Sequence, residues 1–314
     1  MLHDLIIIGG GCAGLAASIY ARRYNMDVVV LTEGLGGTIT TTHLVENYPG
    51  FASVSGQELA DAFINHAKAN DVPFRIGSRV SRVWKEKEPA GNGTPEFDVF
   101  KVQFGADVHE ARTVLLATGT TYKKLGVPGE LELAAKGVSY CATCDAPFYK
   151  GKKVIIVGGG DSAVKESLIL AEHASEVTIV YRGEKITKAE PINMMRVEAT
   201  TNINFRLKSN ITEISGDKKV QKVKFDDGSE MDIDGVFVEI GRLPLTDMVN
   251  ELDVEKNEKN EIKINGMSET SVPGFYAAGD VANTEWKQAI VSADEGCKAA
   301  FKAFEFVSAQ KTRL

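Results

Sequence analysis

The fold of this chain is decided by the stretch LIIIGGGCAGLAASIYARRYNMDVVVLTE, residues 5–33. The apolar run at residues 5–8 predicts a buried strand, and the glycines that follow it predict a tight turn. A helical pattern continues to about Tyr24, and a second apolar run at residues 28–31 predicts another strand. This order of strand, glycine turn, helix and strand is a βαβ unit.

The turn of this unit reads Gly9-x-Gly11-x-x-Gly14. Glycines in this pattern let the backbone approach a pyrophosphate, which then lies at the positive N-terminal end of the helix. Glu33 closes the second strand, 19 positions after Gly14, where an acid binds the 2′-hydroxyl of a ribose. The loop therefore suits an unphosphorylated adenosine ribose, as in FAD. The alternative is a glycine turn that serves helix–strand packing alone.

The same order recurs in KKVIIVGGGDSAVKESLILAEHASEVTIVYRG, residues 152–183. Strands are predicted at residues 154–157 and 177–181, with a helix between them that ends near His173. Two nucleotide-binding halves in one chain indicate an α/β protein with two Rossmann-like domains of three layers each.

The second loop differs from the first in the charge that follows it. It reads Gly158-x-Gly160-x-x-Ala163, and the segment YRGEKITK after its second strand is basic at Arg182, Lys185 and Lys188. Positive charge at this place suits a 2′-phosphate, as in NADPH. A solvated, lysine-rich turn is the alternative.

Other segments have clear patterns. A helix is predicted at residues 56–70, and KEKEPAGNGTPE at residues 85–96 is predicted to be the solvated tip of a hairpin. The final helix is predicted to run from about Lys287 to Ser308.

Composition excludes several classes of protein. The chain has 314 residues, of which 43% are hydrophobic, and a net charge of −7, which argues against a nucleic-acid surface. No apolar run approaches the about 20 residues that span a bilayer, and no signal peptide is recognisable at the start. We therefore expect a cytoplasmic protein without a nucleic-acid or membrane partner.

The stretch VSYCATCDAPF, residues 138–148, contains two of the four cysteines, Cys141 and Cys144. A zinc site would need two more ligands, and Cys12 and Cys297 lie in separate patterns, so no metal site is predicted. In a chain without a disulfide framework, a Cys-x-x-Cys pair is more often redox-active than structural. Hydride transfer and disulfide reduction are both two-electron reactions, so two dinucleotides and a dithiol form a plausible electron path.

At this point the residues resemble a known family, the low-molecular-weight thioredoxin reductases, over almost the whole chain. The resemblance is carried by CATCD (141–145), GGTITTT (36–42), ENYPG (46–50), ATG (117–119), GGGDSAVKES (158–167), AAGDV (277–281) and WKQAIVSADEGCKAA (286–300). It implies a discontinuous FAD-binding domain of residues 1–113 and 244–314. Residues 114–243 would be an inserted pyridine-nucleotide domain that carries the cysteines.

The resemblance also implies an activity, thioredoxin-disulfide reduction, and a role for each site residue. Cys144 would receive electrons from the flavin, Cys141 would attack the disulfide of a thioredoxin-like protein, and Asp145 would protonate the departing thiolate. A homodimer is implied as well. The remaining residues implied to contact FAD are Gly37, Thr38, Asn47, Gly119, Gly279, Asp280, Lys287, Gln288 and Ala289, and those implied to contact the pyridine nucleotide are Gly158, Gly160, Asp161, Ser162, Ala163, Arg182 and Lys185.

The chain departs from the family pattern most clearly at the electron-donor site. The family signature His-Arg-Arg-x-x-x-Arg reads Tyr181-Arg182-Gly183-x-x-x-Thr187 here. Loss of guanidinium groups weakens recognition of a 2′-phosphate, because lysine replaces arginine poorly at a bidentate site. NADPH and NADH therefore both stay open as donors. Two alternatives are a relative that uses reduced ferredoxin or a deazaflavin, and a small-molecule dithiol oxidase.

Overall fold

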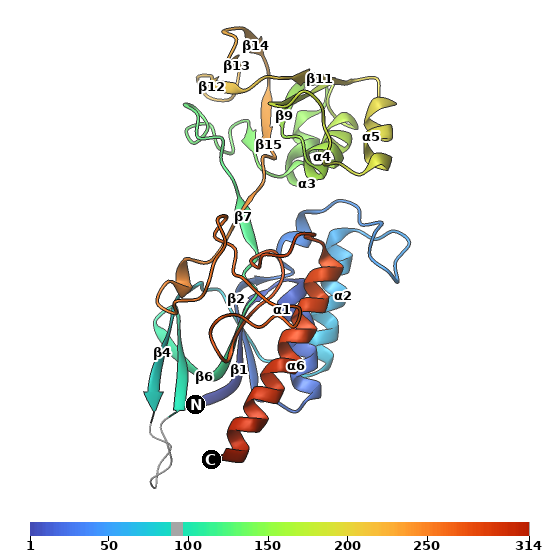
Figure 1. Ribbon diagram of the computed structural model, residues 1–314. Coiled ribbons are helices and arrows are strands. Elements are labelled where there is room, and N and C mark those ends of the chain that lie inside the picture. Colours follow the sequence, from blue (N-terminus) through green and yellow to red (C-terminus); the bar gives the residue numbers. More distant parts are fainter. Residues whose placement is uncertain (89–96, 314) are drawn as a thin grey trace. The chain divides into compact units, whose positions relative to one another are not determined.

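The structure is a computed structural model that describes residues 1–88 and 97–313 (Figure 1). The chain forms two compact units, one of Met1–Thr121 with Leu243–Leu314 and one of Tyr122–Arg242. The hairpin tip predicted at residues 85–96 lies, from residue 89 on, outside the described residues.

The first unit is built on one mixed sheet with the order β3-β2-β1-β6-β5-β4, in which β17 also pairs with β6. The strands β3, β2, β1, β6 and β17 are parallel, whereas β5 and β4 continue the sheet as an antiparallel hairpin. The elements are β1 (Leu2–Gly10), β2 (Val28–Leu35), β3 (Phe74–Ile76), β4 (Val80–Glu88), β5 (Phe97–Phe104), β6 (Asp107–Leu116), β17 (Phe275–Ala277), α1 (Cys12–Arg23), α2 (Gly56–Ala69) and α6 (Ala289–Arg313), with short 3₁₀ turns at Gly37–Thr41 and Asp247–Val249.

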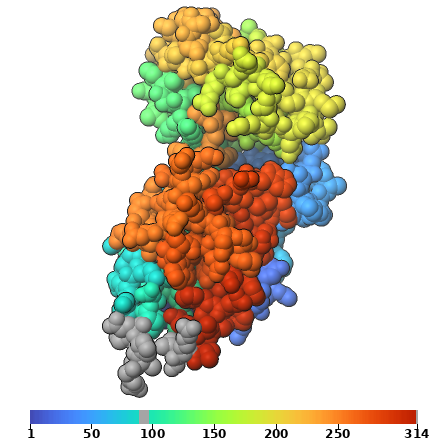
Figure 2. Space-filling view, viewed as in Figure 1, coloured from blue at the N-terminus to red at the C-terminus, as the bar shows by residue number. Residues whose placement is uncertain are grey.

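Helix packing in this unit depends on a small residue. Helices α1 and α6 lie side by side against one face of the sheet (Figure 1). They approach closely at Gly296, where an added Cβ would lie 2.1 Å from the carbonyl oxygen of Ala13. Residues of strands and helices form one apolar cluster on each face of the sheet. In the space-filling view the C-terminal residues, coloured orange to red, make up much of the visible surface of this unit (Figure 2).

The second unit contains a parallel sheet with the order β11-β10-β9-β15-β8 and a separate antiparallel sheet, β12-β13-β14. Apolar clusters again lie on both faces of the parallel sheet. The elements are β8 (Val138–Ser139), α3 (Ala142–Asp145), β9 (Lys153–Val157), α4 (Asp161–Ala171), β10 (Glu176–Tyr181), α5 (Pro191–Glu198), β11 (Ile203–Leu207), β12 (Ile211–Ser215), β13 (Lys222–Phe225), β14 (Glu230–Asp232) and β15 (Gly235–Val238), with a 3₁₀ turn at Ala146–Tyr149.

The chain crosses between the units twice, and the two crossings pair with each other. They are the strands β7 (Thr120–Tyr122) and β16 (Arg242–Pro244), which form a two-stranded ribbon. The backbone bond from the amide of Lys123 to the carbonyl of Gly241, at 3.0 Å, continues this ribbon at one end.

The predicted α/β class and both βαβ units are confirmed, but two boundaries are wrong. The strand β2 runs on to Leu35, so Glu33 lies within the strand and does not close it. The last helix covers Ala289–Arg313, not residues 287–308. Lys287 is held before the helix because its ammonium group donates to the carbonyls of Asp280 (2.7 Å) and Ala282 (2.8 Å). None of the helices in the described part of the chain is long and apolar enough to cross a bilayer.

Candidate active site

A disulfide joins Cys141 and Cys144 in the second unit, with their Cα atoms 5.4 Å apart. The short helix α3 follows Cys141 directly, so that Cys141 is its N-cap residue. The amide of Cys144 donates to Sγ of Cys141 at 3.2 Å, and the amide of Cys141 donates to Oγ of Ser139 at 3.1 Å. Cys144 is exposed and Cys141 is half-buried.

This geometry treats the two sulfurs differently. A backbone N–H that donates to sulfur stabilises the thiolate more than the thiol, and the N-terminal end of a helix acts in the same direction. After reduction, the negative charge is therefore favoured on Cys141. Asp145, the last residue of α3, is half-buried, and its amide donates to the carbonyl of Cys141 at 3.2 Å.

Two carboxyl groups that the sequence did not single out are connected to the disulfide through the first residue of α3. Glu166 of α4 accepts a hydrogen bond from the amide of Ala142 at 3.0 Å, directly after Cys141. Glu239, which follows β15, is buried and shares a hydrogen bond with Glu166. Burial, together with the neighbouring carboxyl group, raises the pKa of Glu239, and burial raises that of Glu166. A glutamate at the end of an apolar strand, as in VFVEIG (residues 236–241), was the one signal that could have shown this pair.

The second glycine loop lies beside this pair and is open on one side. An added Cβ at Gly158 would lie 2.2 Å from the carbonyl oxygen of Glu239 and 2.9 Å from Cβ of Ala163, which explains the need for glycine there. In contrast, an added Cβ at Gly160 would meet no atom within 4 Å. The backbone at Gly160 is thus free to approach a ligand, as a pyrophosphate site requires.

Asp161 begins α4 and its carboxylate is already engaged. It accepts from the amide of Glu190 (2.9 Å) and the side chain of Asn193 (3.0 Å), and it forms an ion pair with Lys165 (2.8 Å). Burial alone would raise the pKa of Asp161, but these bonds lower it below its usual value. The side chain therefore fixes α5 against α4, whereas the exposed Ser162 next to it is available to a ligand.

In the segment predicted to select the donor, the ring of Tyr181 lies against backbone glycines. This ring packs against two glycines, because an added Cβ would meet ring atoms at 2.3 Å from Gly159 and 2.5 Å from Gly183. Arg182 and Lys185 are exposed. An aromatic ring thus covers the central glycine of the loop, and two exposed basic side chains follow it.

The first glycine loop, in the other unit, shows the packing of a dinucleotide-binding turn. An added Cβ at Gly14 would lie 2.0 Å from the carbonyl oxygen of Gly9, so only glycine allows this approach of α1 to β1. Gly37 borders the same loop, since its Cβ would lie 2.9 Å from Cα of Gly11. Glu33 is exposed at the edge of the loop. These glycines form a cradle that a Cβ would fill, and the acid beside it suits a ribose.

Residues far apart in the sequence also meet in this unit. The side-chain amide of Asn47 donates to Oε1 of Gln288 at 3.2 Å. The buried Glu295 accepts from the amide of Gly279 at 2.7 Å and from the hydroxyl of Thr284, and Lys287 pairs with Glu261 at 2.9 Å. The other predicted residues of this group, Thr38, Gly119, Asp280 and Ala289, are in the same unit.

The two remaining cysteines are poor candidates for chemistry. Burial raises the pKa of both Cys12 and Cys297 to about 11, so the reactive thiolate is scarce at neutral pH. Cys12, the first residue of α1, is free, as is Cys297 of α6.

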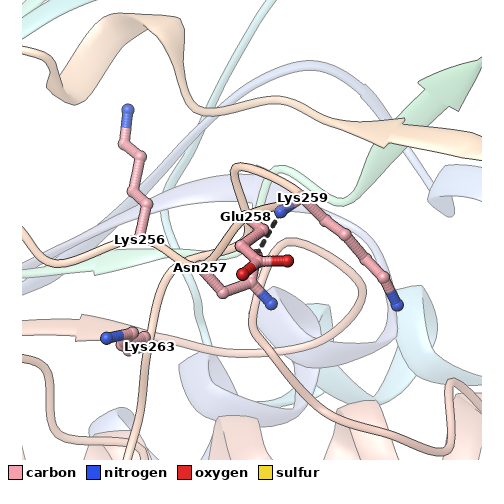
Figure 3. Close-up of a pocket in the computed structure, with 5 residues that line it drawn as sticks. All are labelled: Lys256, Asn257, Glu258, Lys259 and Lys263. Atoms are coloured by element: carbon pink, nitrogen blue, oxygen red, sulfur yellow. Dashed lines mark hydrogen bonds between the residues drawn. The ribbon is translucent and has the colours of Figure 1, made fainter.

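A surface pocket of the first unit does not coincide with any predicted site residue. It is lined by Lys256, Asn257, Glu258, Lys259 and Lys263 (Figure 3). Asn257 accepts the amide of Lys259 at 2.9 Å and so shapes the turn. The three lysine side chains point away from one another and do not converge on a common ligand (Figure 3).

A disulfide in the same unit as an open glycine loop is typical of enzymes that move electron pairs between dinucleotides and thiols. The model of the pyridine nucleotide-disulphide oxidoreductase family matches residues 3–296, and the chain belongs to this family.

Three comparisons with known proteins support a more specific relationship. The chain is 39% identical to the thioredoxin reductase of Bacillus subtilis, over 98% of this chain and 95% of that protein. It is similar in structure to Lactococcus lactis thioredoxin reductase, with a TM-score of 0.90, 32% identity and coverage of 98% and 99% of the two chains. It is also similar to a ferredoxin-flavin thioredoxin reductase from Clostridium acetobutylicum, with a TM-score of 0.53, 33% identity and 98% coverage of each chain. The predicted resemblance to the thioredoxin reductases is confirmed.

Proposed function

We infer that the chain is a thioredoxin-disulfide reductase. Electrons would pass from a pyridine nucleotide to FAD, then to the Cys141–Cys144 disulfide, and finally to a thioredoxin-like protein. The observation that carries this proposal is the disulfide at the start of α3, whose Cys141 sulfur receives the amide of Cys144. Full-length similarity to thioredoxin reductases supports the same reaction.

Each cysteine has a separate role in this reaction. Two electrons and one proton convert the disulfide into one thiol and one thiolate, and a flavin bound at the first glycine loop would supply the electrons. Cys141 carries the thiolate and attacks a sulfur of the partner disulfide, which releases the partner's other sulfur as a thiolate. Asp145 protonates that leaving group and then takes the proton of the Cys144 thiol. The sulfur of Cys144 attacks Cys141 in the mixed disulfide, which restores the enzyme disulfide and releases the partner's second sulfur as a thiolate.

Cofactor, assembly and location follow the same proposal. FAD would bind at Gly9, Gly11 and Gly14, with its ribose at Glu33, within a domain of residues 1–113 and 244–314. The exposed acid and the tight glycine cradle support this choice. The pyridine nucleotide would bind within residues 114–243. We propose a cytoplasmic homodimer, as the resemblance implies.

The identity of the electron donor is tested by rapid mixing of the yellow holoprotein with NADPH, NADH and reduced ferredoxin in separate runs. We expect either pyridine nucleotide to bleach the flavin absorbance within milliseconds to seconds, followed by reduction of added thioredoxin. Bleaching by ferredoxin alone would contradict the pyridine-nucleotide proposal. A reductase that takes its electrons from ferredoxin is the second candidate function. It is favoured by Tyr181, whose ring covers Gly159, and by similarity to the ferredoxin-flavin enzyme.

We further predict that a triple variant, Tyr181→His with Gly183→Arg and Thr187→Arg, prefers NADPH. A Cβ at Gly183 would lie 2.5 Å from the Tyr181 ring, so Gly183→Arg alone forces this ring to move, and the smaller ring of histidine relieves the contact. Each new guanidinium bond to the 2′-phosphate adds about 1.5–3 kcal/mol. We expect kcat/KM for NADPH to rise at least about tenfold, by the same principle, while that for NADH stays nearly constant. An equal change for both nucleotides would show that these positions do not contact the 2′-phosphate.

A further inference from the structure

The carboxyl groups of Glu166, which is half-buried, and Glu239, which is buried, form a pair within the second unit. Glu239 is 7% exposed and sits where β15 ends, beside the glycine loop at Gly158. Its side chain is hydrogen-bonded to Glu166 of α4, and a bond between two carboxyl groups requires that one of them keeps a proton. Among the described residues, Oε1 of Glu239 has no hydrogen-bond partner.

The surroundings of the pair restrict its charge. Arg242 of β16 is the cation that acts on both carboxyl groups, and it does not cancel the effect of burial, because the pKa of each stays raised. The helices α3 and α4 carry further charged groups: Asp145 follows Cys144, and Asp161 is paired with Lys165. Two carboxyl groups in this setting cannot both ionise at low cost, so the pair holds a shared proton around neutral pH.

The pair acts on the disulfide through a single backbone group. Glu166 accepts the amide of Ala142 at 3.0 Å, and Ala142 lies between the N-cap Cys141 and the rest of α3. The side chain therefore fixes the start of the helix that presents Cys141 Sγ to the amide of Cys144. Because Glu166 is bonded to the residue next to Cys141, a change in the charge of the pair changes the electrostatic potential at the sulfurs.

We propose that Glu166 and Glu239 are positioning residues that share one proton, and that loss of this proton makes the Cys141–Cys144 disulfide harder to reduce. The proposal rests on the redox role proposed for the disulfide. Reduction adds two electrons and one proton and leaves one thiol and one thiolate. The thiolate is disfavoured when the pair behind it carries a second negative charge, and by linkage the thiolate favours retention of the shared proton.

The test compares the disulfide equilibrium of variants with that of the unmodified holoprotein. Flavin-bound protein is equilibrated with buffers of reduced and oxidised dithiothreitol from pH 6 to 9, quenched with acid and alkylated. Mass spectrometry of the peptide with Cys141 and Cys144 then gives the equilibrium constant for reduction. Glu239→Gln keeps the shape of the side chain but cannot supply the second charge.

We divide the equilibrium constant for reduction of Glu239→Gln by that of the unmodified protein. This ratio should rise about fivefold to tenfold between pH 6 and pH 9, because only the unmodified protein gains the second charge. Glu166→Gln, whose side chain still accepts a hydrogen bond from the amide of Ala142, should show the same rise with pH. If Glu239→Gln loses its flavin, the result for Glu166→Gln decides the question. The matched control is Glu172→Gln, an exposed position at the end of α4, for which the ratio should stay constant. A ratio that does not change with pH in the glutamate-pair variants would overturn the proposal. Because neither donor nor thioredoxin is used, this outcome is independent of the turnover reaction.

Discussion

A Cys141→Ser variant should lose thioredoxin reduction by at least about three orders of magnitude, while its flavin is still bleached by the donor. Serine leaves the chain without the attacking sulfur, which is the one that receives the amide of Cys144. The proposed flavin site lies in the first unit, and the substitution changes none of its residues. Stopped-flow absorbance measures flavin reduction, and a coupled thioredoxin assay measures turnover.

The matched control for this variant is Cys297→Ser. Cys297 is free and its pKa is raised to about 11 by burial, so its removal should leave both measurements within about twofold of the unmodified protein. Turnover that survives Cys141→Ser would contradict the dithiol mechanism, because each cycle needs both sulfurs. The roles are tested by Cys144→Ser, which should trap a mixed disulfide with the partner, whereas Cys141→Ser should not; the opposite result would reverse the roles assigned to the two cysteines.

Gly14→Ala should yield a protein that no longer retains flavin. Its new methyl group would lie 2.0 Å from the carbonyl oxygen of Gly9, which is backbone and cannot rotate away. The helix α1 must therefore shift from β1, which removes its N-terminal amides from the pyrophosphate position. Overpacking of this kind costs about 1–3 kcal/mol or more. The flavin content per chain, from the ratio of visible to ultraviolet absorbance, measures the effect.

Gly34→Ala is the control for this substitution. An added Cβ at Gly34, within β2 of the same unit, would meet no atom within 4 Å, so the variant should be as yellow as the unmodified protein. Full flavin content in Gly14→Ala would show that the first loop does not hold the pyrophosphate. The second loop carries Ala163 at the matching position, so the requirement at Gly14 arises from its own packing and not from the motif alone.

The elements that the sequence predicted best are those in which local pattern and burial agree. Both βαβ units have apolar strands followed by glycine, and the structure buries those strands on both faces. The Cys-x-x-Cys pair could be predicted because its chemistry depends on neighbours in the sequence. The ends of the last helix could not be predicted, because they depend on tertiary contacts. Lys287 is bonded to the backbone before the helix begins, and Lys311, which binds Asp4 at 2.9 Å, supports the final turns.

Contacts between distant residues could not be predicted in the same way. Asn47 and Gln288 are 241 positions apart, and no pattern in either segment indicates their hydrogen bond. The Glu166–Glu239 pair depends on the order of β9 and β15 in the sheet, which periodicity does not determine. The sequence shows Tyr181 in place of the signature histidine, but no pattern indicates that its ring lies over Gly159.

The ribbon formed by β7 and β16 makes the second unit separable as a cassette. Because Lys123 and Gly241 are bonded neighbours, the intervening residues leave and rejoin the host at one place. A gene segment of this kind can be exchanged between relatives without a change in the strand order of the first unit, since both junctions lie side by side. Replacement of the segment by a short turn offers a route to a minimal flavin carrier, and its transfer to another host offers a portable dithiol module.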